Sequence, residues 1–259
     1  MYNNILFQTS AGGITTITLN RPEVYNSLNE ETCLELLGAL NLCKGENTKV
    51  VVLTGNGKGF CSGQDIKQLI EQPNIKPSDI IRKTYNPLIL AMRRLGKTII
   101  CKLNGVAAGA GCSLALACDM IIASEESFLS EAFIGIGLVP DSGSSYFITK
   151  LVSRNKVFEL LALGNKISAV EGQKIGIINT VVPANILDKT VEEWAEKISN
   201  SPLKAIELIK NMLHNIDTKT LEEVLEMEAQ MQDIAADTQD FKEGVKAFKE
   251  KRKPNFKGH

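Results

Sequence analysis

Apolar residues in the first part of the chain fall into short runs separated by stretches with helical spacing. Four β-branched or continuously apolar runs predict half-buried or buried strands, at residues 14–19, 50–54, 99–103 and 120–123. Helical patterns lie between these runs, at residues 30–44, 78–95 and 108–118. Because strands and helices alternate, the sequence predicts an α/β fold whose sheets are covered on both faces.

From Arg154 onward the pattern is mostly helical. Amphipathic helices are predicted at residues 186–199, 202–214, 221–236 and 240–249. These helices have too few partners of their own to bury every apolar face, so we expect them to pack on the core or on another subunit. No low-complexity linker interrupts the chain, and we expect a core over residues 1–198 followed by a helical oligomerisation region over residues 199–259.

Composition narrows the function classes. The chain of 259 residues is 44% hydrophobic and 23% charged, which is typical of a globular protein, and its formal net charge is −1. A nucleic-acid surface needs a basic stripe, so we expect no nucleic-acid partner. The longest apolar run, residues 106–117, is short and rich in Gly and Ala, and the first ten residues do not resemble a signal peptide. We therefore expect no membrane association.

Cysteine and histidine usage limits the chemistry. The six cysteines lie in apolar surroundings without a Cys-x-x-Cys pair, which predicts reduced core thiols in a cytoplasmic protein and no metal site. The only histidines are His214, in a helical pattern, and the terminal His259. Catalysis by a Ser–His–Asp or Cys–His arrangement has almost no candidate base. The chemistry therefore falls to carboxylates and backbone amides.

Asp141 is the strongest candidate for a catalytic base. It lies in the segment Gly135-Ile136-Gly137-Leu138-Val139-Pro140-Asp141-Ser142-Gly143. Apolar surroundings disfavour the charged carboxylate and raise its basicity, which suits a proton shuttle near neutral pH. The alternative interpretation is that Asp141 caps a helix beginning at Ser142.

Two glycine-rich segments follow predicted strands and precede helices, at residues 55–65 and 104–119. Neither ends in the Gly-Lys-Ser/Thr of a phosphate loop, and the second lacks the third glycine of a dinucleotide-binding fingerprint. Taken singly, each has a structural alternative: an ordinary flexible turn for the first, a tightly packed buried helix for the second. Together they could direct two N–H groups to one point, and two converging N–H groups form an oxyanion hole.

The segments Phe60–Ile66, Asn104–Gly111 and Gly137–Gly143 together resemble the crotonase, or enoyl-CoA hydratase/isomerase, superfamily. Residues 19–23 and 248–258 resemble it as well, so the likeness covers essentially the whole chain. The third segment is most similar to the ring-epoxide isomerase branch of the phenylacetate pathway. The resemblance implies a spiral core of ββα turns with a C-terminal helical trimerisation region, assembled as a homotrimer or a dimer of trimers.

The resemblance also implies an acyl-CoA thioester as substrate, with no cofactor beyond the coenzyme A that the substrate carries. The amides of Gln64 and Ala110 would form the oxyanion hole, and Phe133 and Tyr146, with residues 80–92, would wall the acyl pocket. A C-terminal lysine, Lys249 or Lys257, would reach the CoA phosphates from a neighbouring subunit. The CoA-binding residues implied by the likeness are Arg21, Tyr25, Ser62, Asp65, Ile66 and Lys67.

The resemblance implies that hydratases of the family carry two catalytic glutamates, one at the position of Ser113 and one at that of Phe133. This sequence has neither glutamate, only the serine and the phenylalanine. Hydration needs groups to activate water and deliver a proton, and these side chains cannot do so. Glu131 lies two residues before Phe133, and on a strand the two side chains would face the same side. Glu131 would then have a catalytic or orienting role, or it would be a solvated or paired carboxylate.

Moving a double bond needs only one base, because the same group can remove a proton and return it elsewhere. We therefore expect an acyl-CoA isomerase in which Asp141 forms an enolate that the two amides stabilise. The acyl group is either a ring epoxide or a Δ3-enoyl chain. Alternatives are a hydratase-like enzyme of β-oxidation, a thioester hydrolase on the same fold, and a catalytically silent acyl-CoA-binding protein.

Overall fold

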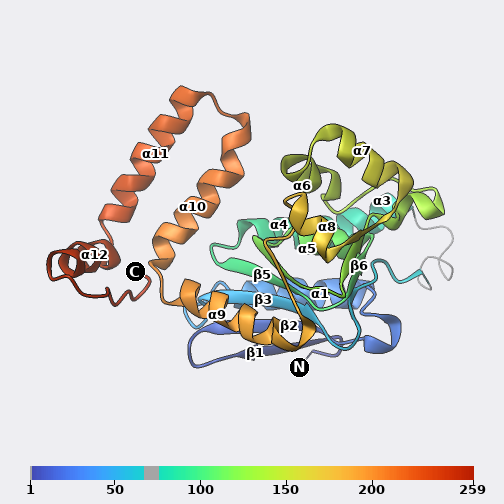
Figure 1. The fold of residues 1–259 in the computed structure, drawn as a ribbon, viewed down its shortest axis with the longest axis horizontal. Helices are drawn as coiled ribbons and strands as arrows, with labels where there is room; N and C mark the ends of the chain where they lie inside the picture. Colours follow the sequence, from blue (N-terminus) through green and yellow to red (C-terminus); the bar gives the residue numbers. More distant parts are fainter. Residues whose placement is uncertain (1, 67–75) are drawn as a thin grey trace.

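The computed structural model describes residues 2–66 and 76–259, and its strands form two sheets (Figure 1). The larger sheet has the strand order β1-β2-β3-β5-β7-β10 and the smaller has β4-β6-β8-β9. Only β1 and β9 pair antiparallel with their neighbours within the described sheets. The strands of the larger sheet are β1 (Ile5–Thr9), β2 (Ile14–Leu19), β3 (Val50–Gly55), β5 (Thr98–Leu103), β7 (Met120–Ser124) and β10 (Thr180–Val182). Those of the smaller are β4 (Gly59–Cys61), β6 (Val106–Ala108), β8 (Phe128–Ser130) and β9 (Lys166–Ser168).

Successive turns of the chain build the two sheets together. Each turn adds one strand to the larger sheet, one short strand to the smaller sheet and then helical structure: β3-β4, β5-β6 and β7-β8 are the three such pairs. The helices that follow them are α3 (Pro77–Ile80), α4 (Asn86–Arg94), α5 (Ala110–Leu116), α6 (Ser144–Leu151) and α7 (Arg154–Leu163). This arrangement is a spiral of ββα turns.

The larger sheet is covered on both faces, which explains its continuously apolar strands. All six residues of β3 are buried. One face packs into the main core with α1 (Glu30–Leu42), α4 and α5. Val50, Val52 and Ile100 face the other way and pack against α9 (Leu187–Ser199), which crosses the sheet.

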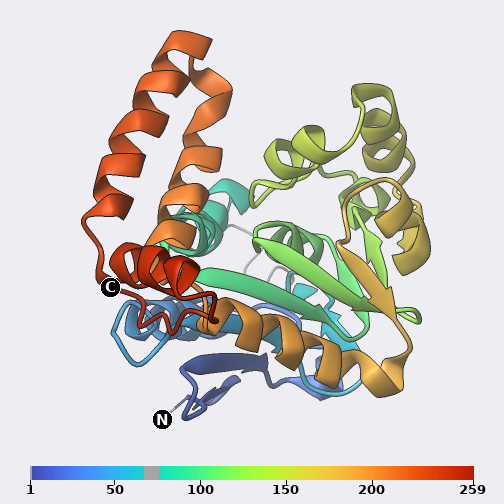
Figure 2. The ribbon, with the colours of Figure 1, turned by 60° about the vertical axis from the view of Figure 1, so that its left-hand side comes forward.

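The last three helices form an arm beside this core (Figures 1 and 2). They are α10 (Leu203–Asn215), α11 (Leu221–Ala236) and α12 (Gln239–Lys249). A capping box starts α11, where Thr220 Oγ1 accepts from the Glu223 N–H and the Glu223 carboxylate accepts from the Thr220 N–H. Large apolar side chains remain exposed along the arm, among them Leu213, Leu225 and Phe248. The arm therefore presents apolar surface that its own chain does not cover.

Most of the predicted elements are confirmed, with ends within two residues at nearly every boundary. Two predictions were wrong in detail. The helix expected over 78–95 is interrupted by a π-helical turn at Ile81–Tyr85. The glycine-rich segments were expected to run straight from strand to helix, but each contains a short strand, β4 or β6, because three residues cannot show a hydrophobic period.

Small helical pieces complete the chain. They are 3-10 turns at Pro22–Val24, Ala132–Ile136, Ala184–Ile186 and Ile216–Thr218, together with α8 (Ala169–Lys174). Across the described residues, the helices are all too short or too polar to cross a membrane.

Candidate active site

A cavity of about 180 Å³ opens where the two glycine-rich segments meet the 132–141 segment. Its walls are mostly apolar, and Asp141 is the only carboxylate among the described residues that line it. The lining residues are Ser62, Gly63, Gln64, Ile66, Pro77, Ile80, Ile81, Tyr85, Gly109, Ala110, Ala132, Phe133, Ile136, Leu138 and Asp141. The structure therefore brings Gln64, Ala110, Phe133 and Asp141 together, as the sequence predicts.

The Ala110 amide is free to bind a ligand because of its place in the fold. Ala110 is the first residue of α5, so its N–H has no carbonyl partner within the helix. The preceding Gly109 has φ 51° and ψ −125°, a conformation that requires glycine. This turn sets the first N–H groups of α5 at the cavity wall.

The backbone N–H of Gln64 is the second candidate donor, and it comes from the first glycine-rich segment. The N–H of Leu28 donates to the Gly63 carbonyl at 2.7 Å, and the Leu28 carbonyl accepts from Asp65 N–H at 2.9 Å. Leu28 thus pairs with the carbonyl before Gln64 and the N–H after it. In this parallel bridge the backbone N–H of Gln64 itself points away from Leu28.

Gly63 allows these two segments to approach closely. A Cβ added to Gly63 would lie 2.7 Å from the Ala108 oxygen and 3.3 Å from the Ala110 nitrogen. Its φ of +92° also favours glycine. The glycine therefore brings the backbones that carry the two candidate amides side by side, as an oxyanion hole requires.

Asp141 sits on a tight turn with two left-handed residues. Ser142 has φ 53° and Gly143 has φ 81°. Ser142 Oγ donates to Asp141 Oδ1 at 2.8 Å. Burial raises the pKa of Asp141 above its usual value, while the Ser142 hydrogen bond acts in the opposite direction. The alternative interpretation of Asp141 as a helix cap is wrong, because α6 begins at Ser144 and Gly143 occupies its N-cap position.

Two serines fix the main chain of Asp141. Its carbonyl oxygen accepts from Ser144 N–H at 3.0 Å and from Ser113 Oγ at 3.1 Å. Ser113 lies on α5, the helix that begins with Ala110. The candidate base is therefore tied directly to the helix that carries one candidate oxyanion amide.

Tyr85 lines the cavity. From the sequence it was expected only as part of residues 80–92, the predicted wall of the acyl pocket. It ends the π-helical turn, and its hydroxyl donates to the Gln64 side-chain oxygen. The Gln64 Nε2 atom is buried without a hydrogen-bond partner among the described residues. Burial raises the pKa of the Tyr85 hydroxyl, so this hydroxyl stays protonated and acts as a donor.

Arg21 and Asp65, two of the residues implied for CoA binding, form an ion pair with one another. Arg21 Nη2 lies 2.9 Å from Asp65 Oδ2, and Arg21 Nη1 donates to the Ser27 carbonyl at 2.8 Å. These contacts hold the loop after β2 against the segment that carries Gln64.

The remaining implied CoA-binding residues lie near this pair. Ser62 N–H donates to the Tyr25 carbonyl at 3.0 Å, and Tyr25 is 51% exposed. Ile66 is exposed and lines the cavity. Lys67 lies outside the described residues. The segment thus offers an exposed surface beside the cavity, as a CoA moiety would need.

The two residues expected in the acyl pocket are placed differently. Phe133 is buried and lines the cavity. Tyr146 is not among the described lining residues: it is 51% exposed on α6, where Lys150 Nζ donates to its hydroxyl at 2.8 Å. Because adjacent helical residues point in different directions, Phe147 is the buried residue of this pair.

Glu131 does not lie on a strand, contrary to our expectation. It follows β8 and precedes the 3-10 turn at Ala132–Ile136, so it and Phe133 do not share a strand face. Glu131 is 1% exposed, and its Oε1 accepts from Ser144 Oγ at 2.5 Å. It is a buried, paired carboxyl group behind the cavity wall.

The cysteines are structural. All six are free and buried, and burial raises the pKa of Cys33 to about 12. Such thiols are poor nucleophiles at neutral pH. Among the described residues, Asp141 is the cavity's acid–base candidate.

The spiral core and the cavity define a crotonase fold, and comparison with known proteins identifies the family. Residues 9–259 match the family model for enoyl-CoA hydratase/isomerase. The chain therefore belongs to the enoyl-CoA hydratase/isomerase family and is an enzyme acting on CoA thioesters.

Relatives within the family differ in activity. The chain is 37% identical to 1,2-epoxyphenylacetyl-CoA isomerase of Escherichia coli (strain K12), with 95% of each chain covered. It is 30% identical to trans-2-decenoyl-[acyl-carrier-protein] isomerase of Streptococcus mutans, covering 99% of each. Among solved structures, the enoyl-CoA hydratase from Bacillus anthracis superposes with a TM-score of 0.91 at 33% identity, covering 99% of this chain and 100% of that one.

Proposed function

We propose that the protein is an acyl-CoA isomerase in which Asp141 is the single acid–base group. The observation that carries this proposal is the composition of the cavity, where Asp141 is the only carboxylate among the described lining residues. A group that both removes and returns a proton can move a double bond without a second catalytic carboxylate. The proposal includes no cofactor beyond the coenzyme A of the substrate, because Asp141 both removes and returns the proton.

In the proposed reaction, the N–H groups of Gln64 and Ala110 bind the thioester oxygen. Asp141 takes a proton from the carbon next to the thioester carbonyl, and the resulting negative charge moves onto that oxygen. The protonated Asp141 then returns the proton to a carbon further along the acyl group, and the double bond shifts toward the thioester. Amide donors placed at the developing charge lower the barrier to enolate formation.

Hydration is the less favoured activity. Ser113 is fully buried and uses its hydroxyl to bind the Asp141 carbonyl, so it cannot deliver a proton to a substrate. Phe133 contributes an apolar ring to the cavity. Neither residue can activate water, and the carboxylate pair that the hydratases carry at these positions is missing.

The walls of the cavity favour an apolar acyl group. Ile80, Ile81, Ile136 and Leu138 contribute aliphatic side chains, and Phe133 contributes a ring. Such a cavity suits an arene-derived or short unsaturated acyl chain. We propose 2-(1,2-epoxy-1,2-dihydrophenyl)acetyl-CoA as the substrate, on the likeness to the E. coli isomerase. With this substrate the same base and oxyanion hole would rearrange the epoxide-fused ring to an isomeric oxepin, with the proton removed by Asp141 returned to the product. A Δ3-enoyl-CoA is the second candidate.

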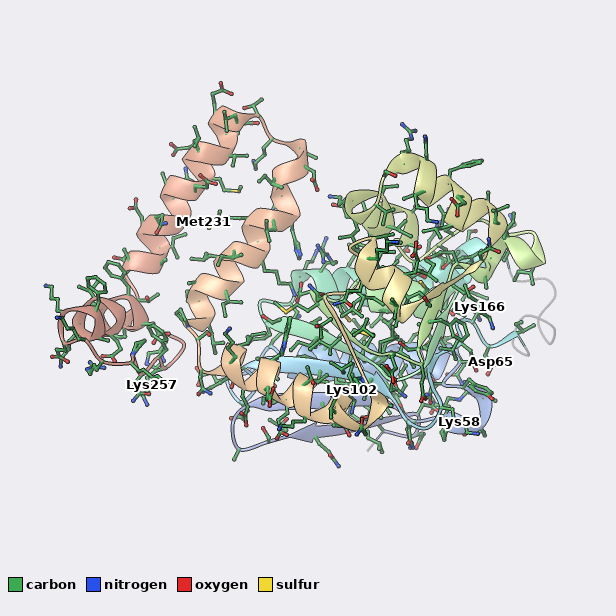
Figure 3. The ribbon with its side chains drawn as sticks, viewed as in Figure 1. Lys58, Asp65, Lys102, Lys166, Met231 and Lys257 are labelled. Carbon is green, nitrogen blue, oxygen red and sulfur yellow. The ribbon has the colours of Figure 1, made fainter. Side chains whose placement is uncertain are left out.

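We also propose a trimer or a dimer of trimers. The exposed apolar side chains of α10 to α12 are the surface that another subunit would cover. Lys257 lies at the far end of the molecule from Asp65 (Figure 3), so it could approach a CoA bound near Asp65 only from a neighbouring subunit. A cytoplasmic location stays a prediction.

The test is an assay of the wild-type protein and Asp141→Asn with a 3-enoyl-CoA, which follows the absorbance of the conjugated 2-enoyl thioester. We expect turnover by the wild type and a loss of about 10²-fold or more in the variant. A thiol reagent in a parallel cuvette detects released CoA, which would indicate a thioester hydrolase. CoA binding by the wild type without turnover of the enoyl or the ring-epoxide substrate would indicate a silent acyl-CoA-binding protein.

A further inference from the structure

A buried carboxyl group lies directly behind the turn that carries Asp141. Glu131 Oε1 accepts from Ser144 Oγ at 2.5 Å, and Ser144 itself is fully buried as the first residue of α6. The other carboxyl oxygen, Oε2, is buried with no hydrogen-bond partner among the described residues. A carboxyl group in this setting is costly to maintain, and the proposed reaction does not use it.

Ser144 connects this carboxyl group to the base. Its hydroxyl donates to Glu131, while its backbone N–H donates to the Asp141 carbonyl at 3.0 Å. The contact with Glu131 therefore fixes the residue that holds one side of the Asp141 carbonyl. Ser113 holds the other side from α5.

The surroundings of Glu131 shift the pKa of its carboxyl group upward. Burial raises the pKa of Glu131, and the negative charge of Asp141 raises it further; the hydrogen bond from Ser144 on α6 and the neighbouring Cys112 thiol on α5 act in the opposite direction. The charged or titratable groups that act on it are thus Asp141 and Cys112, and burial raises the pKa of the Cys112 thiol as well. No cation among these groups offsets a charge on Glu131.

From this geometry we infer that Glu131 is a positioning residue, which holds the Asp141 turn against α5 through its hydrogen bond with Ser144. The inference rests on the proposed role of Asp141 as the base. The bond from Ser144 Oγ to Glu131 Oε1 requires only an acceptor oxygen at this position, so a neutral side chain of the same shape should hold the turn as well.

The test compares Glu131→Ala, Glu131→Gln and Ser144→Ala. The Gln side chain is uncharged, has nearly the same shape, and keeps an oxygen that can accept from Ser144. The first readout is hydrogen exchange of the Ser144 amide, which reports on its bond to the Asp141 carbonyl and does not depend on activity. We expect exchange to be about tenfold faster in Glu131→Ala and unchanged in Glu131→Gln, because local opening follows the loss of the anchoring bond.

The second readout separates kcat from KM for the 3-enoyl-CoA. Glu131→Ala and Ser144→Ala should each lower kcat by about 10-fold or more with little change in KM, since a misplaced base affects the chemical step. The double variant should be no worse than either single variant, because both act through one contact. Glu131→Gln, as the conservative replacement, should retain most of the wild-type kcat.

Thr15→Val serves as the control for lost stability. It removes a buried hydroxyl pair, Thr15 Oγ1 to Thr48 Oγ1 at 2.8 Å, in the larger sheet. It should lower the unfolding temperature and leave kcat unchanged well below that temperature. If Glu131→Ala fails to fold, Ser144→Ala and Glu131→Gln carry the test.

Three results would overturn the inference. An unchanged rate of opening at the backbone amide of residue 144 in both Glu131→Ala and Ser144→Ala would show that the contact does not hold the turn. A loss of kcat in Glu131→Gln as large as in Glu131→Ala would show that a charged carboxylate is needed. Full turnover by Asp141→Asn, assayed in parallel, would instead overturn the proposed function, and the exchange readout would still report on the contact.

Discussion

Ser113 Oγ donates a hydrogen bond to the backbone carbonyl of Asp141 at 3.1 Å. Ser113 stands one turn into α5, whose first residue is Ala110. The contact links the candidate base to the helix that carries one candidate oxyanion amide. Ser113 therefore has an orienting contact in this chain. The hydratases that the chain resembles carry a glutamate at this position.

Gly63→Ala should abolish most activity. A Cβ at this position would meet the Ala108 carbonyl oxygen at 2.7 Å and would also strain a backbone with φ +92°. The segments carrying the Gln64 and Ala110 amides would have to separate, and losing an oxyanion donor costs about 10²–10³-fold in kcat. Steady-state kinetics measure this loss, and circular dichroism checks that the variant is folded.

Gly135→Ala is the matched control for that substitution. No heavy atom lies within 4 Å of the position that its Cβ would occupy. We expect wild-type kcat and stability for this variant. Equal losses in the two glycine variants would contradict the role assigned to the Gly63 approach.

Removing the hydroxyl of Ser142 should change the pH dependence of activity. Its hydrogen bond lowers the pKa of Asp141, so Ser142→Ala should raise that pKa. The base is active when deprotonated, and the acidic limb of the kcat/KM profile should therefore move to higher pH.

Ser142→Gly should move the same limb in the same direction. It should also be more stable than Ser142→Ala, by about 1 kcal/mol, because residue 142 has φ 53° and glycine adopts this conformation without strain. Denaturant unfolding of the two variants measures the difference. An acidic limb that stays in place in both would argue that Asp141 is not the titrating base.

Glu131 should make the protein less stable as the pH rises. Its pKa in the folded state is raised above the ordinary 4.5, so the folded state binds more protons than the unfolded state just above that pH. Unfolding free energy then falls as pH increases from the unfolded pKa toward the folded one. Glu131→Gln should lose less stability over this window than the wild type.

Urea unfolding at a series of pH values from 4 upward measures this difference. Asp141 should also lower the free energy of unfolding as the pH rises, because burial raises its pKa too. Measuring Asp141→Asn in parallel should separate the two contributions. Parallel stability curves for the wild type and Glu131→Gln would contradict a raised Glu131 pKa.

The sequence was sufficient to predict β2, β3, β5 and β7 of the larger sheet and the C-terminal helices, because their apolar runs extend over four or more residues. The outer strands of that sheet, β1 and β10, were not predicted. The sequence could not predict β4, β6 or β8, since each has three residues and forms only by pairing with its neighbours in the smaller sheet. The π-helical turn before α4 was missed for a related reason: one extra residue per turn barely alters an apolar pattern.

The candidate site was predictable where glycines and an isolated acid mark it. Gln64, Ala110, Phe133 and Asp141 meet at one cavity. Tyr146 was assigned to the wrong surroundings because side-chain direction depends on the local helix, which begins at residue 144. For Glu131 the strand face was wrong because a 3-10 turn follows it, whereas the alternative of a paired carboxylate agrees with the structure. The donation from Tyr85 to Gln64 joins distant segments and has no signal in the sequence.

The most direct test of the account follows proton removal itself. Phenylacetyl-CoA carries α-protons that a base can remove even though the molecule has no double bond to shift. Incubated in D₂O with the wild type, it should gain deuterium at the α-carbon, measured by mass spectrometry. With Asp141→Asn, incorporation should slow by about 10²–10⁴-fold, the usual contribution of a placed base. Deuterium incorporation at the same rate with both proteins would contradict the assignment of Asp141 as the base.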